Sequence, residues 1–152
     1  MFASGSRRFQ STFRVLRIKH ISLTGEHDKR LAFYRDFLGL KASERLAQPD
    51  YGVYTTFLSP DNETQSSKIE LIEGLGDNNP IDKSPSASHG GIHHICFEVD
   101  NIEAARKAAM AKGIRFLEDS KRPKVGVHGN PVIFLHPSDC GGILTELEEE
   151  SK

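Results

Sequence analysis

Two stretches of the chain, 17–23 and 91–99, alternate apolar and polar residues with the two-residue period of a half-buried strand. Their sequences, RIKHISL and GIHHICFEV, align with each other, so that His20 and His94 take equivalent places. In both stretches the histidine falls on the face opposite the apolar residues that follow it. We therefore expect two equivalent strands, each with one apolar face and one face that is free to carry chemistry.

A helical pattern follows each of these strands. Apolar residues recur every three or four positions over 28–38, and Gly39 stands where a left-handed C-terminal cap is expected. The second helix is expected over 101–112, because Asp100 and Glu103 match the capping-box pattern in front of an alanine-rich run.

Three strand candidates follow each helix, and residues 74–90, which are rich in Gly, Pro, Ser and Asn, separate the two series. The candidates are 41–46, 52–58 and 67–73 in the first series and 114–118, 131–135 and 142–148 in the second. This order predicts an α+β fold of two tandem βαβββ modules in one domain, residues 17–152, with repeat one at 17–73, a linker at 74–90 and repeat two at 91–148.

The last strand of each series contains a glutamate at an equivalent place. SKIELIEG resembles GILTELEE, and a spacing of 76 residues places Glu70 of the first on Glu146 of the second. The spacing between His20 and His94 is 74 residues. Two nearly equal spacings indicate an internal duplication whose copies are related by a pseudo-twofold axis.

A histidine and a glutamate from each copy would meet if the last strand of a module lies beside the first. Taken singly, a histidine on a half-buried strand is usually a structural residue, and a glutamate among charged neighbours is usually exposed. Neither explanation accounts for a pair that recurs at matched spacing. We therefore predict a site for a divalent ion of the Mn, Fe, Co, Ni or Zn type, because imidazole prefers such metals and carboxylates neutralise their charge. Its residues are His20, Glu70, His94 and Glu146.

The other histidines give weaker signals. His93 falls in the apolar phase and is expected to be packed and hydrogen-bonded, whereas His27 and His89 are expected in solvated turns. His128 lies between glycines whose backbone amides could approach a substrate, but a plain loop residue is the simpler interpretation.

Length and charge restrict the classes of partner. The 152 residues suffice for one domain with a core, and the net charge of -1 gives no overall attraction to nucleic acid or to an anionic membrane surface. No apolar run approaches the ~20 residues of a spanning helix. Cys96 and Cys140 lack the spacing of a zinc ribbon or a disulfide scaffold, which suits a reducing compartment. We expect a soluble protein that binds neither nucleic acid nor membrane.

Residues 1–16 differ in composition from the rest of the chain. They contain Arg7, Arg8 and Arg14 with several serines, and the first acidic residue is Glu26. This composition is typical of a mitochondrial transit peptide, and a disordered basic tail is the alternative. We expect the mature protein in the mitochondrial matrix.

Three segments, GGIHHICFEVDNI, KVGVHGNPVIFLHP and DCGGILTELEE, resemble the vicinal oxygen chelate, or glyoxalase-like, superfamily and within it the methylmalonyl-CoA epimerase family in its animal mitochondrial form. The resemblance spans about residues 17–148. It implies an eight-stranded, cup-shaped sheet, a divalent metal, an acyl-CoA substrate and a homodimer. By position it implies that His20, His94 and Glu146 are metal ligands, with Glu70 at a place filled by Gln or Glu in relatives.

The implied reaction is epimerisation of methylmalonyl-CoA at C2, which interconverts the (R) and (S) forms in propionyl-CoA breakdown. Removal of this weakly acidic proton needs a positive centre that stabilises the enolate, and inversion needs a proton-transfer group on each side of C2. We expect Glu146 to be one group, and Glu70 is a weaker candidate for the other. The chain departs from bacterial members, which often carry a glutamate where it has Thr55.

Alternative functions stay open on the same residues. A glyoxalase I type isomerase, or lactoylglutathione lyase, uses the same two-His, two-Glu set. An extradiol dioxygenase fits less well, because it needs a facial triad with open sites on iron. A metal-free module that binds a small ligand belongs to a different class. The substrate-binding residues are unknown from sequence, and Lys121, Arg122 and Lys124 are the only candidates for phosphate contacts that it suggests.

Overall fold

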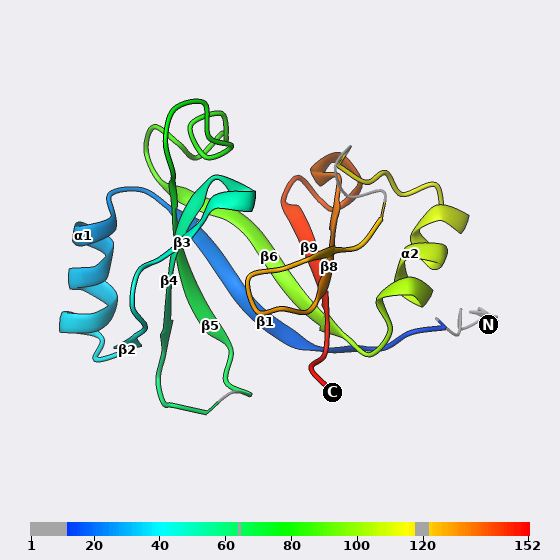
Figure 1. Ribbon diagram of the computed structural model, residues 1–152, viewed down its shortest axis with the longest axis horizontal. Coiled ribbons are helices and arrows are strands. Elements are labelled where there is room, and N and C mark those ends of the chain that lie inside the picture. Colours follow the sequence, from blue (N-terminus) through cyan, green and yellow to red (C-terminus); the bar gives the residue numbers. More distant parts are fainter. Residues whose placement is uncertain (1–11, 64, 118–121) are drawn as a thin grey trace, which may run out of the picture.

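The computed structural model describes residues 12–63, 65–117 and 122–152, which form one mixed nine-stranded sheet with a helix at either end (Figure 1). The strand order is β2-β4-β5-β1-β6-β9-β8-β7, and β3 pairs with β4. The first module contains β1 (Val15–Thr24), α1 (His27–Leu31), β2 (Lys41–Ala42), β3 (Leu46–Gln48), β4 (Val53–Ser59) and β5 (Lys68–Gly74). The second contains β6 (Gly91–Val99), α2 (Ile102–Ala111), β7 (Lys124–Val125), β8 (Pro131–Leu135) and β9 (Leu144–Glu149).

The two modules repeat the same pairing. In each, the last strand lies parallel to the first, β5 beside β1 and β9 beside β6, and the preceding strand is antiparallel to the last. The first strands, β1 and β6, pair antiparallel and join the modules into a continuous sheet. The expected α+β duplication is confirmed, because every pairing in one module has its counterpart in the other.

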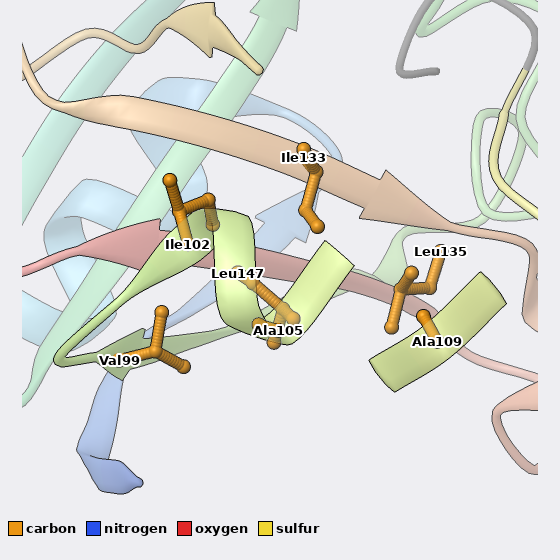
Figure 2. Close-up of a cluster of buried hydrophobic side chains, with 7 residues drawn as sticks. All are labelled: Val99, Ile102, Ala105, Ala109, Ile133, Leu135 and Leu147. Carbon is orange, nitrogen blue, oxygen red and sulfur yellow. The ribbon is translucent and has the colours of Figure 1, made fainter. Parts of the chain in front are cut away.

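Each helix covers the apolar face of its own module. In the second module, α2 packs Ile102, Ala105 and Ala109 onto the apolar side chains of β6, β8 and β9, which are Val99, Ile133, Leu135 and Leu147 (Figure 2). In the first module, Leu31 and Tyr34 pack against Leu23, Leu58 and Leu71. Burial of these side chains fixes which way each strand faces, so the alternate residues of the strands point to the opposite, polar face.

Several elements differ from expectation in their limits. The helix expected at 28–38 is a short α1 followed by a π-helix, Ala32–Phe37, in which Leu38 N donates to Phe33 O at 3.0 Å. Gly39 does adopt a left-handed conformation, with φ of 74°. The strand expected at 41–46 is divided between β2 and β3. The expected strand 114–118 is represented in the described chain only by an isolated bridge between Phe116 and Leu135, and residue 118 lies outside the described residues.

The start of α2 is capped by a different residue from the one expected. The side chain of Asn101 accepts a hydrogen bond from Ala104 N at 2.8 Å, so Asn101 is the N-cap. Asp100 instead accepts hydrogen bonds from the backbone and side chain of Arg14. Strand β1 begins at Val15, two residues before the expected start of the domain.

Three register shifts interrupt the seam between β1 and β6, and two of them are β-bulges at equivalent places in the two strands. At one bulge the extra residue is His93 of β6, and at the other it is Lys19 of β1. Each directly precedes a histidine of the aligned pair, His94 or His20. An extra residue breaks the strict alternation of a strand and redirects its side chain. The two bulges are therefore part of the duplicated pattern.

None of the helices in the described ranges has the length and apolar character needed to cross a membrane.

Candidate metal centre

Strand register brings the predicted His and Glu residues to one place on the polar face. In the first module Glu70 of β5 lies opposite Ser22, which is two residues beyond His20. In the second module Glu146 of β9 lies opposite Cys96, which is two residues beyond His94. Each glutamate is therefore diagonal to its histidine on the same face, and the antiparallel seam brings the two pairs together.

The four side chains converge on a common point. Nε2 of His20 lies 3.1 Å from Nε2 of His94, and Oε2 of Glu146 lies 3.3 Å and 3.1 Å from these two nitrogens. Oε2 of Glu70 lies 3.7 Å and 3.4 Å from the same nitrogens. Atoms that bind one ion at about 2.0–2.2 Å lie roughly 3 to 3.5 Å apart. The two nitrogens, together with either carboxylate oxygen, thus have the spacing of ligands around a small divalent ion.

Burial and hydrogen bonding also fit a cation at this point. His20, Glu70, His94 and Glu146 are all buried. Oε2 of Glu70 has no hydrogen-bond donor among the described residues, although it is fully enclosed. A buried carboxylate oxygen without a donor is costly unless a positive charge compensates it. The donor set of two imidazoles and two carboxylates suits a divalent ion of the Mn, Co, Ni or Zn type.

The electrostatics of the cluster favour positive charge. Burial opposes ionisation of Glu146, but hydrogen bonds and charge from His20 and His94 hold its pKa well below the usual range. For His20, burial lowers the pKa, yet Glu146 and Glu70 more than offset this and raise its pKa overall. The site therefore holds two carboxylates that attract either protons or a metal ion to the imidazoles.

Cys96 lies beside the cluster but differs from it chemically. Its sulfur faces the same side as Glu146, and burial, together with the charges of Glu146 and Glu148, strongly raises the pKa of the thiol. Only the thiolate is a good metal ligand. Cys96 is thus a protonated, buried thiol next to the four converging side chains.

The bulge residue Lys19 supports the polar face in a way that sequence alternation did not indicate. Alternation places Lys19 on the apolar face with Ile21, but its Nζ lies 3.3 Å from Glu98 and 2.8 Å from Glu148. Arg17 completes the ion pair with Glu98 at 2.9 Å. These cations balance two carboxylates that are almost fully buried next to the metal centre.

The other bulge residue, His93, also leaves the apolar face. Nδ1 of His93 lies 2.8 Å from Nδ1 of His94, on the side of the His94 ring that faces away from the converging atoms. Burial and the neighbouring His94 lower the pKa of His93 to about 4, so the ring is neutral at neutral pH. The expectation of a hydrogen-bonded histidine is confirmed, but the residue belongs to the metal centre and not to the apolar core.

His128, which was interpreted as a plain loop residue, lies over the polar face. Its Nδ1 is 3.3 Å from Glu148, and its ring centroid is 4.9 Å from that of Phe57 and 6.2 Å from that of His20. Asn130 binds the other oxygen of Glu148 at 2.9 Å. The flanking glycines were the only signal in the sequence that this loop approaches the site.

The remaining histidines and Thr55 are placed as follows. The prediction that His27 is solvated is wrong, since its side chain is only 12% exposed and its Nε2 lies 3.0 Å from the hydroxyl of Thr56. His89 is exposed, as expected. Thr55 shares the polar face of β4 with Phe57. It is buried, and its hydroxyl has no hydrogen-bond partner among the described residues.

A cavity of about 1150 Å³ lies beside the candidate metal centre, because His94 and His93 line it. Both modules and the loop between them line it as well, including Tyr51, Ile81 and Phe134. Tyr51 of the first module donates its hydroxyl proton to the carbonyl of Val125 in the second, across this cavity. Such a volume suits a ligand larger than a small metabolite.

One of the three candidate phosphate contacts lines the cavity. Lys124 lines the cavity, and Lys83 of the connecting loop, which the sequence did not suggest, lines it as well. Arg122 is exposed, and Lys121 lies outside the described residues.

Comparisons with known proteins agree with this geometry. Residues 20–134 match the Glyoxalase/Bleomycin resistance protein/Dioxygenase superfamily. The chain is 43% identical to the mitochondrial methylmalonyl-CoA epimerase of Homo sapiens, over 91% of this chain and 77% of the human one. It is 40% identical to the same enzyme of Mus musculus, over 97% of this chain and 83% of the mouse one. The lactoylglutathione lyase of Haemophilus influenzae is less similar, at 30% identity over 88% of this chain and 93% of the lyase.

A solved structure extends the similarity to the fold. Methylmalonyl-CoA epimerase from Streptomyces coelicolor, in a variant complexed with 2-nitronate-propionyl-CoA, superposes with a TM-score of 0.78 at 29% identity, covering 91% of this chain and all of the other. The duplicated sheet, the converging His and Glu side chains and these similarities lead to one assignment. The chain belongs to the Glyoxalase/Bleomycin resistance protein/Dioxygenase superfamily and, within it, to the methylmalonyl-CoA epimerase family.

Proposed function

We propose that the protein interconverts the (R) and (S) epimers of methylmalonyl-CoA by removing and returning the proton at C2. The observation that carries the proposal is the convergence of two imidazoles and two carboxylates, in which an oxygen of each glutamate lies 3.1–3.7 Å from Nε2 of both His20 and His94. His94 also lines a cavity large enough for an acyl-CoA. Family membership supports the substrate.

His20, Glu70, His94 and Glu146 would hold a divalent ion of the Co, Mn, Ni or Zn type. Such an ion supplies positive charge against which the negative charge of an enolate is stabilised. The two histidines contribute neutral ligands, and the two carboxylates compensate the charge of the ion. The orphaned Oε2 of Glu70 and the distances from both carboxylate oxygens to the two imidazole nitrogens support this assignment.

Glu146 would transfer the proton on one side of C2. Its pKa is held below the usual range, so Glu146 is ionised at neutral pH. A base of this strength would accept the proton only because a bound cation makes the C2 proton more acidic. Glu70 is the candidate for the opposite side, because its carboxylate comes from the other module and approaches the same point from β5. One group from each module would then stand on each side of the substrate.

The first test is exchange with solvent. The full chain, loaded with Co(II) or Mn(II), is incubated with one epimer of methylmalonyl-CoA in deuterated water, and inversion and deuterium at C2 are followed together. We expect both, with a loss of about 10²-fold or more in Glu146→Gln. Glu150→Gln, an exposed glutamate on the same segment, is the matched control and should keep full activity.

Glu70→Gln separates the two roles of Glu70, because an amide oxygen can bind a metal but cannot take a proton. We expect the variant to retain metal. A loss of inversion of about a hundredfold would assign the second proton transfer to Glu70. Full activity of the metal-replete variant would remove Glu70 from proton transfer. If the wild-type protein shows no exchange, the glutathione adduct of methylglyoxal is the next substrate to test. If neither substrate is turned over, the alternative of a non-catalytic module that binds a small ligand is favoured.

The location and assembly of the protein belong to the same proposal. Relatives from Mus musculus, Homo sapiens and Bos taurus are named as mitochondrial, which supports residues 1–16 as a transit peptide and the matrix as the site of action. Residues 1–11 lie outside the described residues. Import of a reporter fused to residues 1–16 tests the first point, and light scattering of the purified protein tests the expected homodimer.

A further inference from the structure

The bulge residue His93 occupies a position that the proposed reaction has not used. Its ring lines the cavity beside His94, and its Nδ1 lies 2.8 Å from Nδ1 of His94. Nε2 of His93 has no partner among the described residues. We propose that His93 sets the orientation of the metal ligand His94 and, through the same hydrogen bond, presents its own Nε2–H to an oxygen of the substrate acyl group.

The first step follows from the geometry of His94. Its Nε2 faces His20, Glu70 and Glu146, so this nitrogen is the one available to a metal ion. A metal-binding nitrogen must be unprotonated, so the proton of neutral His94 is on Nδ1. Nδ1 of His94 is therefore a donor.

The second step transfers this constraint to His93. Two ring nitrogens 2.8 Å apart need one donor and one acceptor. Because His94 donates, Nδ1 of His93 accepts, and the proton of the neutral His93 ring is on Nε2. A protonated His93 ring would have no acceptor to offer. Binding of the metal to one histidine thus determines the tautomer of the next.

The third step concerns the direction of the ring. In a regular strand, neighbouring side chains point to opposite faces, so His93 and His94 could not meet. The bulge in β6 at His93 removes this obstacle and brings both rings to the cavity side. At the equivalent bulge in β1, Lys19 is engaged by Glu98 and Glu148, and Nδ1 of His20 has no partner among the described residues. Only the second module therefore offers a donor of this kind to the cavity.

The chemistry of the acceptor follows from the cavity. A donor N–H beside the metal ligands lies where a carboxylate or thioester oxygen of a substituted malonyl thioester would be bound. This part of the inference rests on the proposed function. The orientation of His94 does not, because it concerns the protein and the metal alone.

Two substitutions separate the roles of His93. His93→Asn keeps an acceptor oxygen near the position of Nδ1 but has no group at the position of Nε2, and His93→Leu removes both. We expect His93→Leu to lose about 10- to 100-fold in Co(II) affinity, measured by chelator competition, and His93→Asn to stay close to wild type. With substrate, His93→Asn should raise KM about tenfold, because a hydrogen bond to a charged oxygen is lost. His136→Asn, in a turn outside the cavity, is the matched control.

Nitrogen NMR of the Zn(II)-loaded protein tests the tautomer directly. We expect His93 to carry its proton on Nε2. A proton on Nδ1 of His93, or wild-type Co(II) affinity in a folded His93→Leu variant, would overturn the orienting role. An unchanged KM in His93→Asn would overturn the substrate contact. Absence of epimerisation by the wild-type protein would instead count against the proposed function, while the NMR and affinity results would still decide the orienting role of His93.

Discussion

At Cys96, burial and two neighbouring carboxylates act on the thiol in the same direction. Both raise its pKa, so the sulfur is neutral under physiological conditions and is a poor nucleophile. The neutral thiol lies opposite His20 across the seam between β1 and β6 and would not compete for a metal ion. In this respect Cys96 differs from His20, Glu70, His94 and Glu146 on the same face, which are the proposed metal ligands.

We predict that Cys96 is unreactive in the native protein, because its side chain has no exposed surface and its thiolate is disfavoured. In the Cys140→Ser variant, Ellman's reagent should label no thiol until denaturant is added. Cys96→Ser should leave the partly exposed Cys140 to react in the native state. Rapid native labelling of Cys140→Ser would contradict the burial of Cys96.

Glu98 provides a pH-dependent contribution to stability. The hydrogen bond from Arg17 holds the pKa of Glu98 below its usual range despite partial burial. A carboxyl group with a lowered pKa in the folded state stabilises the fold above its unfolded pKa of about 4.3, and this contribution is lost as pH falls through the folded pKa. Stability on the acid side therefore depends in part on this single group.

The corresponding prediction uses Glu98→Gln. We expect the free energy of unfolding at pH 7 to fall by about 2 kcal/mol, because hydrogen bonds to a buried charged group are lost. The decrease in stability between about pH 5 and pH 3 should be shallower than in wild type. Urea denaturation across this range measures both effects. Glu103→Gln, which breaks an exposed pair with Arg106, should change little, and an equal effect of the two substitutions would contradict the role of Glu98.

At the scale of single elements, two neighbouring side chains at the start of α2 have different roles. Asn101 caps the helix, whereas Asp100 pairs with the exposed Arg14. We predict that Asn101→Ala lowers the free energy of unfolding by about 1 kcal/mol. Asp100→Ala should cost less, since its ion pair is exposed. Thermal or urea denaturation compares the two variants. A larger loss of stability in Asp100→Ala than in Asn101→Ala would indicate that Asp100 is the N-cap.

Alternation and helical periodicity were sufficient to place the main strands and the four converging residues. β8 occupies the expected residues 131–135, and Glu70 and Glu146 lie diagonal to the histidines because the module repeat is exact in register. What the sequence could not show was any departure from a regular period. The bulges at Lys19 and His93 are such departures, and they depend on how β1 and β6 pair across the seam.

The approach of distant loops was also beyond local patterns. His128 reaches Glu148 and Phe57 only because the segment before β8 folds back over the sheet. The capping residue of α2 was misassigned for a related reason. Asp100 and Asn101 are both good N-caps, and the contact of Asp100 with Arg14, 86 residues away in sequence, decides between them.

At the scale of the whole molecule, the candidate metal centre joins the two modules. Each module supplies one histidine and one glutamate, both carboxylates are buried, and Oε2 of Glu70 has no hydrogen-bond donor among the described residues. A bound ion would therefore stabilise the folded state and leave the unfolded chain largely unaffected.

We predict that Co(II) or Mn(II) at about a hundredfold excess over Kd stabilises the protein by about 2.7 kcal/mol, which corresponds to a rise in Tm of roughly 5–10 °C. A chelator should reverse the shift. His20→Ala should abolish it, and His136→Asn should retain it. Equal Tm values with metal and with chelator would contradict a metal site that spans the modules.

The pairing of β9 with β6 has a consequence for how the protein acquires its activity. His20 and Glu146 are separated by 126 residues, and the last strand in the sequence carries Glu146, the last of the four proposed ligands. Contacts of such high sequence separation form late, because the entropy of closing long loops must first be overcome. No folding intermediate that contains the first module alone can capture the ion with all four ligands. Metal uptake should therefore be coupled to the last step of folding and report on its completion.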